Sequence, residues 1–194
     1  MPSRSSTSAS RTVSFEAAVR DVVALVAERA ADRLVIDGRS GAGKTTLARR
    51  VAAEWPSTGA PQVVSLDELY PGWGGLREGG ALARALVLEP HHRGEAGAYR
   101  RFDWARGTFA GPLVVVDPSL PLVVEGCGAL AETVAELADA SLWMDGPEAQ
   151  RRRRALVRDG GGFERHWSMW ADQEDAHIAR ERPDRLAQLA LSVI

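Results

Sequence analysis

The segment of residues 38–45, GRSGAGKT, limits more than any other feature what this chain can fold into. It matches the pattern G-x-x-x-x-G-K-[ST], in which backbone amides surround a phosphate group and the lysine reaches the outer phosphates. Lys44 is also the only lysine among 24 lysine and arginine residues. A lysine is a compact charge on a flexible stem, whereas arginine is a planar fork, so lysine can follow a chain of phosphates. The segment therefore predicts a nucleoside triphosphate site rather than a glycine-rich turn with a solvated lysine.

The residues on both sides of this loop fit the same prediction. Residues 34–37 form a short apolar run that predicts a buried strand, and residues 45–55 predict a helix that ends before Pro56. Strand, loop and helix are the order that a phosphate site needs, because the helix N-terminus adds partial positive charge to the loop amides. Thr45 is expected to place its hydroxyl on magnesium. The residues expected to bind the nucleotide are Gly38, Ser40, Gly41, Ala42, Gly43, Lys44, Thr45 and Thr46.

The composition of the 194 residues indicates one globular domain, expected over residues 13–194, after a Ser-rich tail at residues 1–12 that we expect to be disordered. The formal charge of -2 argues against nucleic-acid and membrane-surface partners. Cys127 is the single cysteine, which fits a reducing compartment and a small core residue. Because the sequence has no long apolar stretch and no signal peptide, we expect a cytoplasmic protein. A homo-oligomer is possible.

The order of apolar runs predicts a doubly wound α/β fold with a mainly parallel five-stranded sheet flanked by helices. A further apolar run, 113–117, is only four residues from the run 122–126, which is too short for a parallel crossover, so we expect it in a peripheral strand or hairpin. Residues 71–80 are expected to be mobile and residues 89–112 irregular. The predicted strands are 34–37, 62–66, 122–126, 141–145 and 189–194, and the predicted helices are 14–31, 45–55, 81–88, 131–138, 147–158 and 163–180.

Two predicted strands end in carboxylates that should lie beside the phosphate loop. Asp67 follows the strand 62–66, and Glu125 closes the strand 122–126. Because ligands of such sheets bind at the carboxyl ends of the strands, Asp67 is the expected base for an acceptor hydroxyl and Glu125 the expected magnesium ligand. Asp117 is a weaker competitor for the metal. Each carboxylate could instead cap a helix or face solvent.

Arg151, Arg154 and Arg158 recur at spacings of three and four, so they share one face of the predicted helix 147–158. On a lid over the nucleotide, Arg151 and Arg154 would bind phosphates and Arg158 would stabilise the transferring group. The glycines at residues 160–162 would supply a hinge. A solvated basic face and a nucleic-acid patch remain alternatives. The aromatic residues that could form either an acceptor pocket or core are Tyr70, Phe102, Trp104, Trp167 and Trp170.

These motifs together resemble the uridine kinase family of P-loop small-molecule kinases, which is similar to phosphoribulokinase and the bacterial pantothenate kinases. The similar segments, in the family's order, are 37–46, 67–70, 102–104, 123–126 and 143–145 with the arginines that follow. The resemblance implies a P-loop fold with an arginine-bearing lid, ATP and Mg²⁺ as cofactors, and a small-molecule hydroxyl as acceptor. It also implies that Asp67 is the base and that Tyr70, Phe102, Asp103 and Trp104 border the acceptor.

The chain departs from this family at the acceptor side. Residues 71–75 lack the carboxylate with which the family's nucleoside kinases bind ribose, residues 105–107 lack the expected histidine, and the lid is shortened. A pyrimidine nucleoside therefore does not follow from the resemblance. A nucleoside such as uridine is still the leading acceptor, with a pantothenate-like alcohol or a sugar as rivals. From another class, a nucleotide-binding regulatory ATPase would share the loop but would not need an acceptor.

Overall fold

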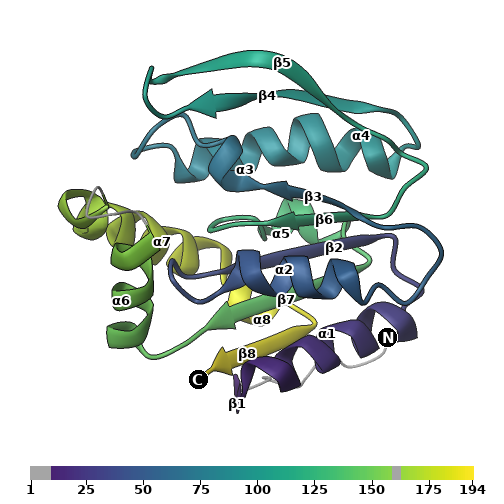
Figure 1. The fold of residues 1–194 in the computed structure, drawn as a ribbon, viewed down its shortest axis with the longest axis horizontal. Coiled ribbons are helices and arrows are strands. Elements are labelled where there is room, and N and C mark those ends of the chain that lie inside the picture. Colours follow the sequence, from purple (N-terminus) through teal and green to yellow (C-terminus); the bar gives the residue numbers. More distant parts are fainter. Residues whose placement is uncertain (1–9, 159–162) are drawn as a thin grey trace.

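The computed structural model describes residues 10–158 and 163–194, and its centre is a parallel sheet of six strands (Figure 1). The strand order is β1-β8-β7-β2-β6-β3, and every neighbouring pair is parallel. The expected α/β class and mainly parallel sheet are confirmed, with one strand more than predicted. The strands are β1 (Arg11–Val13), β2 (Arg33–Gly38), β3 (Gln62–Ser65), β6 (Leu122–Glu125), β7 (Ala140–Asp145) and β8 (Leu189–Val193).

The extra strand lies at the N-terminus, where the sequence predicted disorder to residue 12. Arg11–Val13 pairs with β8, and the amide of Ile194 donates to the carbonyl of Val13 at 3.1 Å. Helix α1 (Phe15–Glu28) follows at once, and the Ser14 hydroxyl caps its N-terminus by accepting from the Ala17 amide at 3.3 Å. The expected tail is thus too long by at least two residues, and residues 1–9 lie outside the described part.

Both faces of the sheet are buried, which divides the core into two layers. Side chains of β2 alternate, so that Leu34 and Ile36 pack with α1 and with α2 (Lys44–Ala53), while Val35 packs on the other side. The remaining helices are α3 (Leu76–Ala83), α4 (Glu89–His92), α5 (Glu132–Ala135), α6 (Glu148–Arg158), α7 (Trp167–Glu181) and α8 (Pro183–Leu186). Burial of both faces explains why the central strands are continuous apolar runs.

Residues 76–116 are more regular than the sequence indicated. Helix α3, a π-helical segment Arg84–Leu88 and α4 follow one another, and β4 (Gly97–Asp103) pairs antiparallel with β5 (Thr108–Val116). The prediction of an irregular segment 89–112 was therefore wrong, and the hairpin prediction for 113–117 is confirmed. Of residues 71–80, predicted to be mobile, the second half belongs to α3. The glycines misled us because they serve close packing: a Cβ on Gly80 would lie 2.6 Å from the carbonyl oxygen of Gly128.

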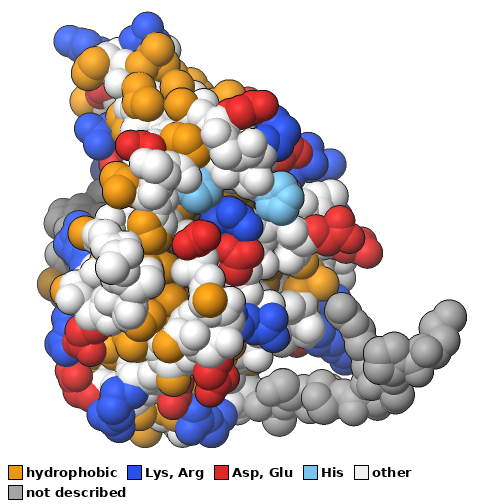
Figure 2. Space-filling view, turned by 90° about the vertical axis from the view of Figure 1, so that its right-hand side faces the viewer, with side chains coloured by type: hydrophobic (Ala, Val, Ile, Leu, Met, Phe, Trp, Pro, Cys, Tyr) orange, Lys and Arg blue, Asp and Glu red, His pale blue; other side chains and the backbone are white. Residues whose placement is uncertain are grey.

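The two ends of the sheet differ in what covers them. Helices α6 and α7 lie beside the carboxyl ends of the strands, at the left of Figure 1. The opposite end, seen in Figure 2, carries acidic, basic and apolar side chains intermixed. The hinge expected at residues 160–162 lies outside the described residues. Within the part that the structure describes, no helix is both long and apolar enough to cross a bilayer.

Candidate functional site

The loop between β2 and α2 has the backbone that the glycine pattern predicted. Gly41 and Gly43 have φ angles of +74° and +104°, a region that favours glycine, and a Cβ on Gly41 would collide with the carbonyl of Arg151. The buried Lys44 folds back over the loop, and its Nζ donates to the carbonyls of Gly38 at 2.8 Å and Arg39 at 3.0 Å. These two hydrogen bonds from Lys44 stabilise the curved conformation of the loop.

This loop borders a cavity of about 680 Å³ at the carboxyl ends of β3 and β6. The cavity brings together most of the residues expected to bind nucleotide, metal and acceptor. Those that line it are Ser40, Gly41, Gly43, Lys44, Thr45, Thr46, Asp67, Glu125 and Arg154. Expected site residues outside its lining are Gly38, Ala42, Tyr70, Phe102, Asp103, Trp104 and Arg151.

The two predicted carboxylates lie in different environments. Glu125 is buried where β6 runs between β2 and β3, and it accepts a hydrogen bond from the Thr45 hydroxyl at 3.0 Å. Burial raises the pKa of Glu125, and the nearby Lys44 ammonium opposes that rise. Asp67 is exposed, in a 3-10 turn directly after β3. The pair therefore offers one enclosed oxygen donor beside Thr45 and one accessible carboxylate.

Asp37, to which sequence reasoning gave no role, fixes the start of the loop. Its carboxylate accepts from the amides of Gly38 at 2.6 Å, Gly128 at 2.8 Å and Leu130 at 2.9 Å, and Nε2 of His177 lies 2.9 Å away. A buried carboxylate needs such a set of donors. The signal available in the sequence was a lone acidic residue at the end of an apolar run.

Glu174 of α7 was also missed, and it contacts the loop from behind. Its Oε1 accepts from the amide of Ser40 at 2.7 Å, from Trp170 Nε1 at 3.1 Å and from the Cys127 thiol at 3.2 Å. The Cys127 sulfur lies 3.3 Å from Lys44 Nζ, and burial raises the pKa of this thiol to about 12. No local pattern could reveal Glu174, because 134 residues separate it from Ser40.

The arginines of α6 divide between two tasks. Arg151 is buried, and its guanidinium donates to the carbonyls of Gly146 at 2.9 Å and Ser40 at 3.2 Å, so it holds α6 against the loop. Arg154 is exposed and lines the cavity. Arg158 ends α6, and its side chain lies outside the described part, so its predicted catalytic role stays a prediction.

Aromatic side chains gather next to Asp67 from segments far apart in the chain. Trp104, directly after β4, donates from Nε1 to the backbone carbonyl of Asp67 at 3.0 Å. Its ring centroid lies 5.3 Å from that of Phe102. The ring of Trp73 lies 4.8 Å from that of Trp104 and stacks on the ring of His166 at 4.4 Å, both measured between ring centroids. Trp73 was missed because it lies in the segment predicted to be mobile.

Two residues that the resemblance placed at the acceptor have other contacts. Tyr70 is 1% exposed, donates its hydroxyl to the carbonyl of Cys127 at 2.8 Å and packs edge-on against Trp170. The carboxylate of Asp103 accepts from the amides of Ala105 and Arg106, both at 3.0 Å, and so stabilises the turn between β4 and β5. In this conformation Tyr70 supports the pocket from within the core, and Asp103 shapes the hairpin.

Solved structures with the same architecture are found among kinases. A protein described as a possible uridine kinase from Bacillus stearothermophilus superposes with a TM-score of 0.60 and 17% identity, over 90% of this chain and 99% of that one. The chain has a P-loop kinase fold. A protein described as a fructose transport system kinase from Silicibacter sp. TM1040 shares this P-loop kinase fold, with a TM-score of 0.54 and 20% identity over 91% and 98% of the two chains.

A curated protein also aligns with this P-loop kinase fold at the level of sequence. A thymidylate kinase of Xanthomonas euvesicatoria pv. vesicatoria (strain 85-10) is 30% identical over 118 residues. The alignment covers 59% of this chain and 52% of that kinase, so the chain spans about half the length of this curated relative. No family model matches the chain.

Proposed function

We propose that the protein is an ATP- and Mg²⁺-dependent kinase that phosphorylates a hydroxyl group of a small molecule. The observation that carries the proposal is the single cavity in which Lys44, Thr45, Glu125 and the exposed Asp67 meet. A triphosphate bound by the loop amides and Lys44 would present its terminal phosphate toward Asp67. The fold and the named kinases with similar structures support the same reaction class.

The metal would be bound by Thr45 and Glu125, whose side-chain oxygens lie 3.0 Å apart. Among the described residues, no group of three histidine, cysteine, aspartate or glutamate side chains could hold a metal alone. This donor set fits magnesium, which prefers oxygen ligands and binds through one or two protein groups together with waters and nucleotide phosphates. Bound magnesium would neutralise charge on the phosphates during transfer.

In the proposed reaction, Asp67 accepts the proton of the acceptor hydroxyl as the acceptor oxygen forms a bond to the γ-phosphorus. The bond between that phosphorus and the bridging oxygen breaks, and ADP leaves with the electron pair. Arg154, which lines the cavity from α6, would neutralise charge on the transferring group. Glu174 and Arg151 would act as positioning residues, because both bind the loop at Ser40.

For the acceptor, a nucleoside such as uridine remains our leading proposal. Trp104 lies beside Asp67, and Phe102 and Trp73 pack against Trp104, so a flat apolar surface adjoins the proposed base. Such rings favour a planar group by stacking. Residues 71–75 contain no carboxylate for a ribose, which keeps a pantothenate-like alcohol and a sugar as rival acceptors.

The decisive experiment measures ADP release with ATP and magnesium against a panel of nucleosides, pantothenate and simple sugars. One acceptor is expected to raise turnover far above basal hydrolysis. Asp67→Asn is the control: it should bind ATP as wild type does by calorimetry but lose roughly 10²- to 10⁴-fold in turnover, the usual contribution of a general base. Slow hydrolysis that no acceptor stimulates would favour a regulatory ATPase, and full transfer by Asp67→Asn would place the base elsewhere.

A further inference from the structure

A second cavity, of about 300 Å³, lies between α3, α5 and α7. Its lining includes Arg77 from α3, Arg84 from the π-helical segment, and His177, Arg180 and Glu181 from α7. None of its lining residues lines the cavity of the phosphate loop. It is therefore a separate site, and we call it the arginine cavity.

Helix periodicity explains why these residues face one hollow. Arg77, Gly80 and Arg84 are three and four residues apart, so they share a face, and small Gly80 leaves space between the two arginines. A Cβ on Gly80 would lie 2.6 Å from the carbonyl oxygen of Gly128, which also lines the cavity. On α7, Arg180 follows His177 by three residues, which turns both side chains to the same side.

The charges of the arginine cavity do not balance. It has three guanidiniums and one carboxylate, Glu181. Arg180 pairs with Glu181 at 2.7 Å, and Arg84 pairs with Glu89 at 3.1 Å. Both pairs are weak, because the side chains of Arg180 and Arg84 are 43% and 39% exposed. Arg77 has no hydrogen-bond or ion-pair partner among the described residues. An anion could therefore bind Arg77 directly and draw the other two arginines from their present partners.

His177 links the arginine cavity to the phosphate loop. It is buried, and its Nε2 lies 2.9 Å from Asp37 Oδ2, while Nδ1 has no hydrogen-bond partner in the part of the chain that the structure describes. The other oxygen of Asp37 accepts from the amide of Gly38, the first residue of the loop, at 2.6 Å. The same carboxylate thus contacts one wall of the arginine cavity and the start of the nucleotide site.

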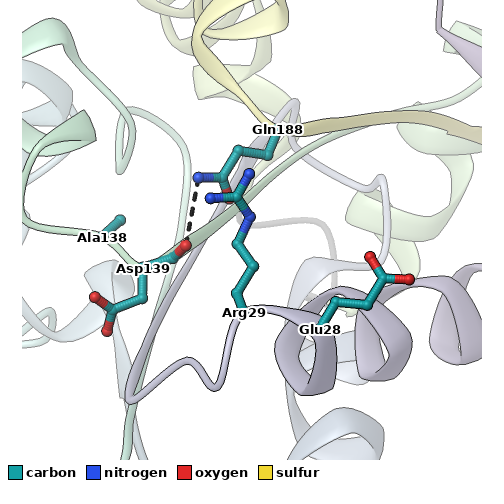
Figure 3. A pocket seen from close by; sticks show the side chains of 5 residues that line it. All are labelled: Glu28, Arg29, Ala138, Asp139 and Gln188. Carbon is teal, nitrogen blue, oxygen red and sulfur yellow. Dashed lines mark hydrogen bonds between the residues drawn. The ribbon is translucent and has the colours of Figure 1, made fainter.

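A third hollow, shown in Figure 3, provides a comparison for the charge of the arginine cavity. It is lined by Glu28, Arg29, Ala138, Asp139 and Gln188, and Gln188 Nε2 donates to the carbonyl of Asp139 at 3.3 Å. One guanidinium stands there against two carboxylates, so the charge surplus is negative. In contrast to this hollow, the arginine cavity has a surplus of positive charge, which favours a phosphate group.

We propose that the arginine cavity binds a phosphate-bearing small molecule or a short polyphosphate. Three guanidiniums can donate charge-assisted hydrogen bonds to phosphate oxygens, and the volume is at the lower end of small-molecule pockets, which suits a compact ligand. Through His177 and Asp37, the occupant would touch the group that fixes the start of the phosphate loop.

The test is calorimetric titration of the full chain with inorganic pyrophosphate. Wild type is expected to show two sites, and Lys44→Ala should retain the one in the arginine cavity. Arg77→Ala and Arg180→Ala should each weaken that Lys44-independent site about 10-fold or more, the effect of removing a charge-assisted hydrogen bond. Arg29→Ala, from the hollow in Figure 3, is the matched control and should leave both sites intact.

Two results would overturn the proposal: no pyrophosphate site remains in Lys44→Ala, or the remaining site is unaffected by both arginine substitutions. Circular dichroism of each variant checks that it folds, and Arg77→Gln and Arg180→Gln replace any alanine variant that does not. The test reads binding at a site independent of Lys44, so its outcome is separate from that of the kinase proposal.

Discussion

The side of the main cavity that we propose for the nucleotide and the side that we propose for the acceptor are built in different ways. On the nucleotide side, buried polar groups meet at short distances: Lys44, Asp37 and Glu174 are 7%, 1% and 4% exposed, and each has a hydrogen bond to the backbone of the loop. On the acceptor side, Asp67 is exposed and Trp104 is 40% exposed. The first is a rigid frame whose contacts are made before any ligand binds, and the second leaves its reactive surface open.

This difference indicates where specificity can change without loss of the fold. A buried polar group that loses its partner costs about 1–3 kcal/mol, so each member of the nucleotide side constrains the others. The exposed Trp104 and the partly buried Trp73 lie on separate segments, and a substitution at Trp104 need disturb only local packing. The contrast predicts graded effects across the cavity, with the largest on the enclosed side.

The largest contrast concerns the reactivity of Cys127. Its pKa is raised to about 12 by burial, against an ordinary value of 9.0, so at pH 8 its thiolate fraction is about 10⁻⁴ instead of about 10⁻¹. Alkylation by iodoacetamide should therefore be roughly 10³-fold slower in the native protein than in urea. The native rate should still rise with pH above pH 9, where the unfolded rate levels off. An apparent native pKa below 8 would mean that the Lys44 ammonium outweighs burial.

Removal of the lysine tests the enclosed side directly. Lys44→Ala should weaken ATP binding about 100-fold, since a charged hydrogen bond is worth about 1.5–3 kcal/mol. Lys44→Arg should also bind poorly, because a planar fork cannot replace an ammonium that reaches the carbonyls of Gly38 and Arg39. Calorimetry with ATP measures both. Unchanged affinity in Lys44→Ala would refute the assignment of the loop.

Arg154 lines the main cavity, and Arg152 on the same helix provides a control. Arg154 and Arg152 are both exposed, but of the two only Arg154 lines the cavity. Arg154→Ala should lower kcat about 10-fold through lost charge stabilisation, whereas Arg152→Ala should change it less than about twofold. Steady-state assays with the best acceptor measure kcat of both variants. Equal effects of the two substitutions would support the solvated basic face that the sequence left open.

The sequence predicts the nucleotide side well because its information is local. The loop, its flanking strand and helix, and the carboxylates that end β3 and β6 follow from runs of neighbouring residues and from sheet geometry. Glu174 could not be found, because its role arises only when α7 packs behind the loop. Arg151 donates to the carbonyl of Ser40, a contact that the spacing of the arginines could not predict, because it does not show whether a carbonyl or a phosphate lies opposite a guanidinium.

On the acceptor side the sequence was less informative, for the same physical reason. Glycine-rich residues 71–80 suggested mobility, yet Gly79 and Gly80 are packed within α3, and Trp73 belongs to the aromatic group. Tyr70 was expected at the acceptor but lies in the core. Aromatic residues are used both inside and at sites, so their place depends on the tertiary packing of segments that the chain order does not specify.

The smallest predicted effect concerns Trp104, and it separates two roles that one residue could have. If its ring stacks on the acceptor, Trp104→Ala should raise the acceptor KM about 2- to 10-fold, as aromatic pairs are worth about 0.5–1.5 kcal/mol, and leave the KM for ATP unchanged. Trp104→Phe keeps a ring but loses the bond from Nε1 to the Asp67 carbonyl at 3.0 Å. Recovery of KM in Trp104→Phe would support stacking. A lower kcat in both variants with an unchanged acceptor KM would instead show that Trp104 acts by positioning Asp67, and the open side of the cavity would then resemble the enclosed side more than we propose.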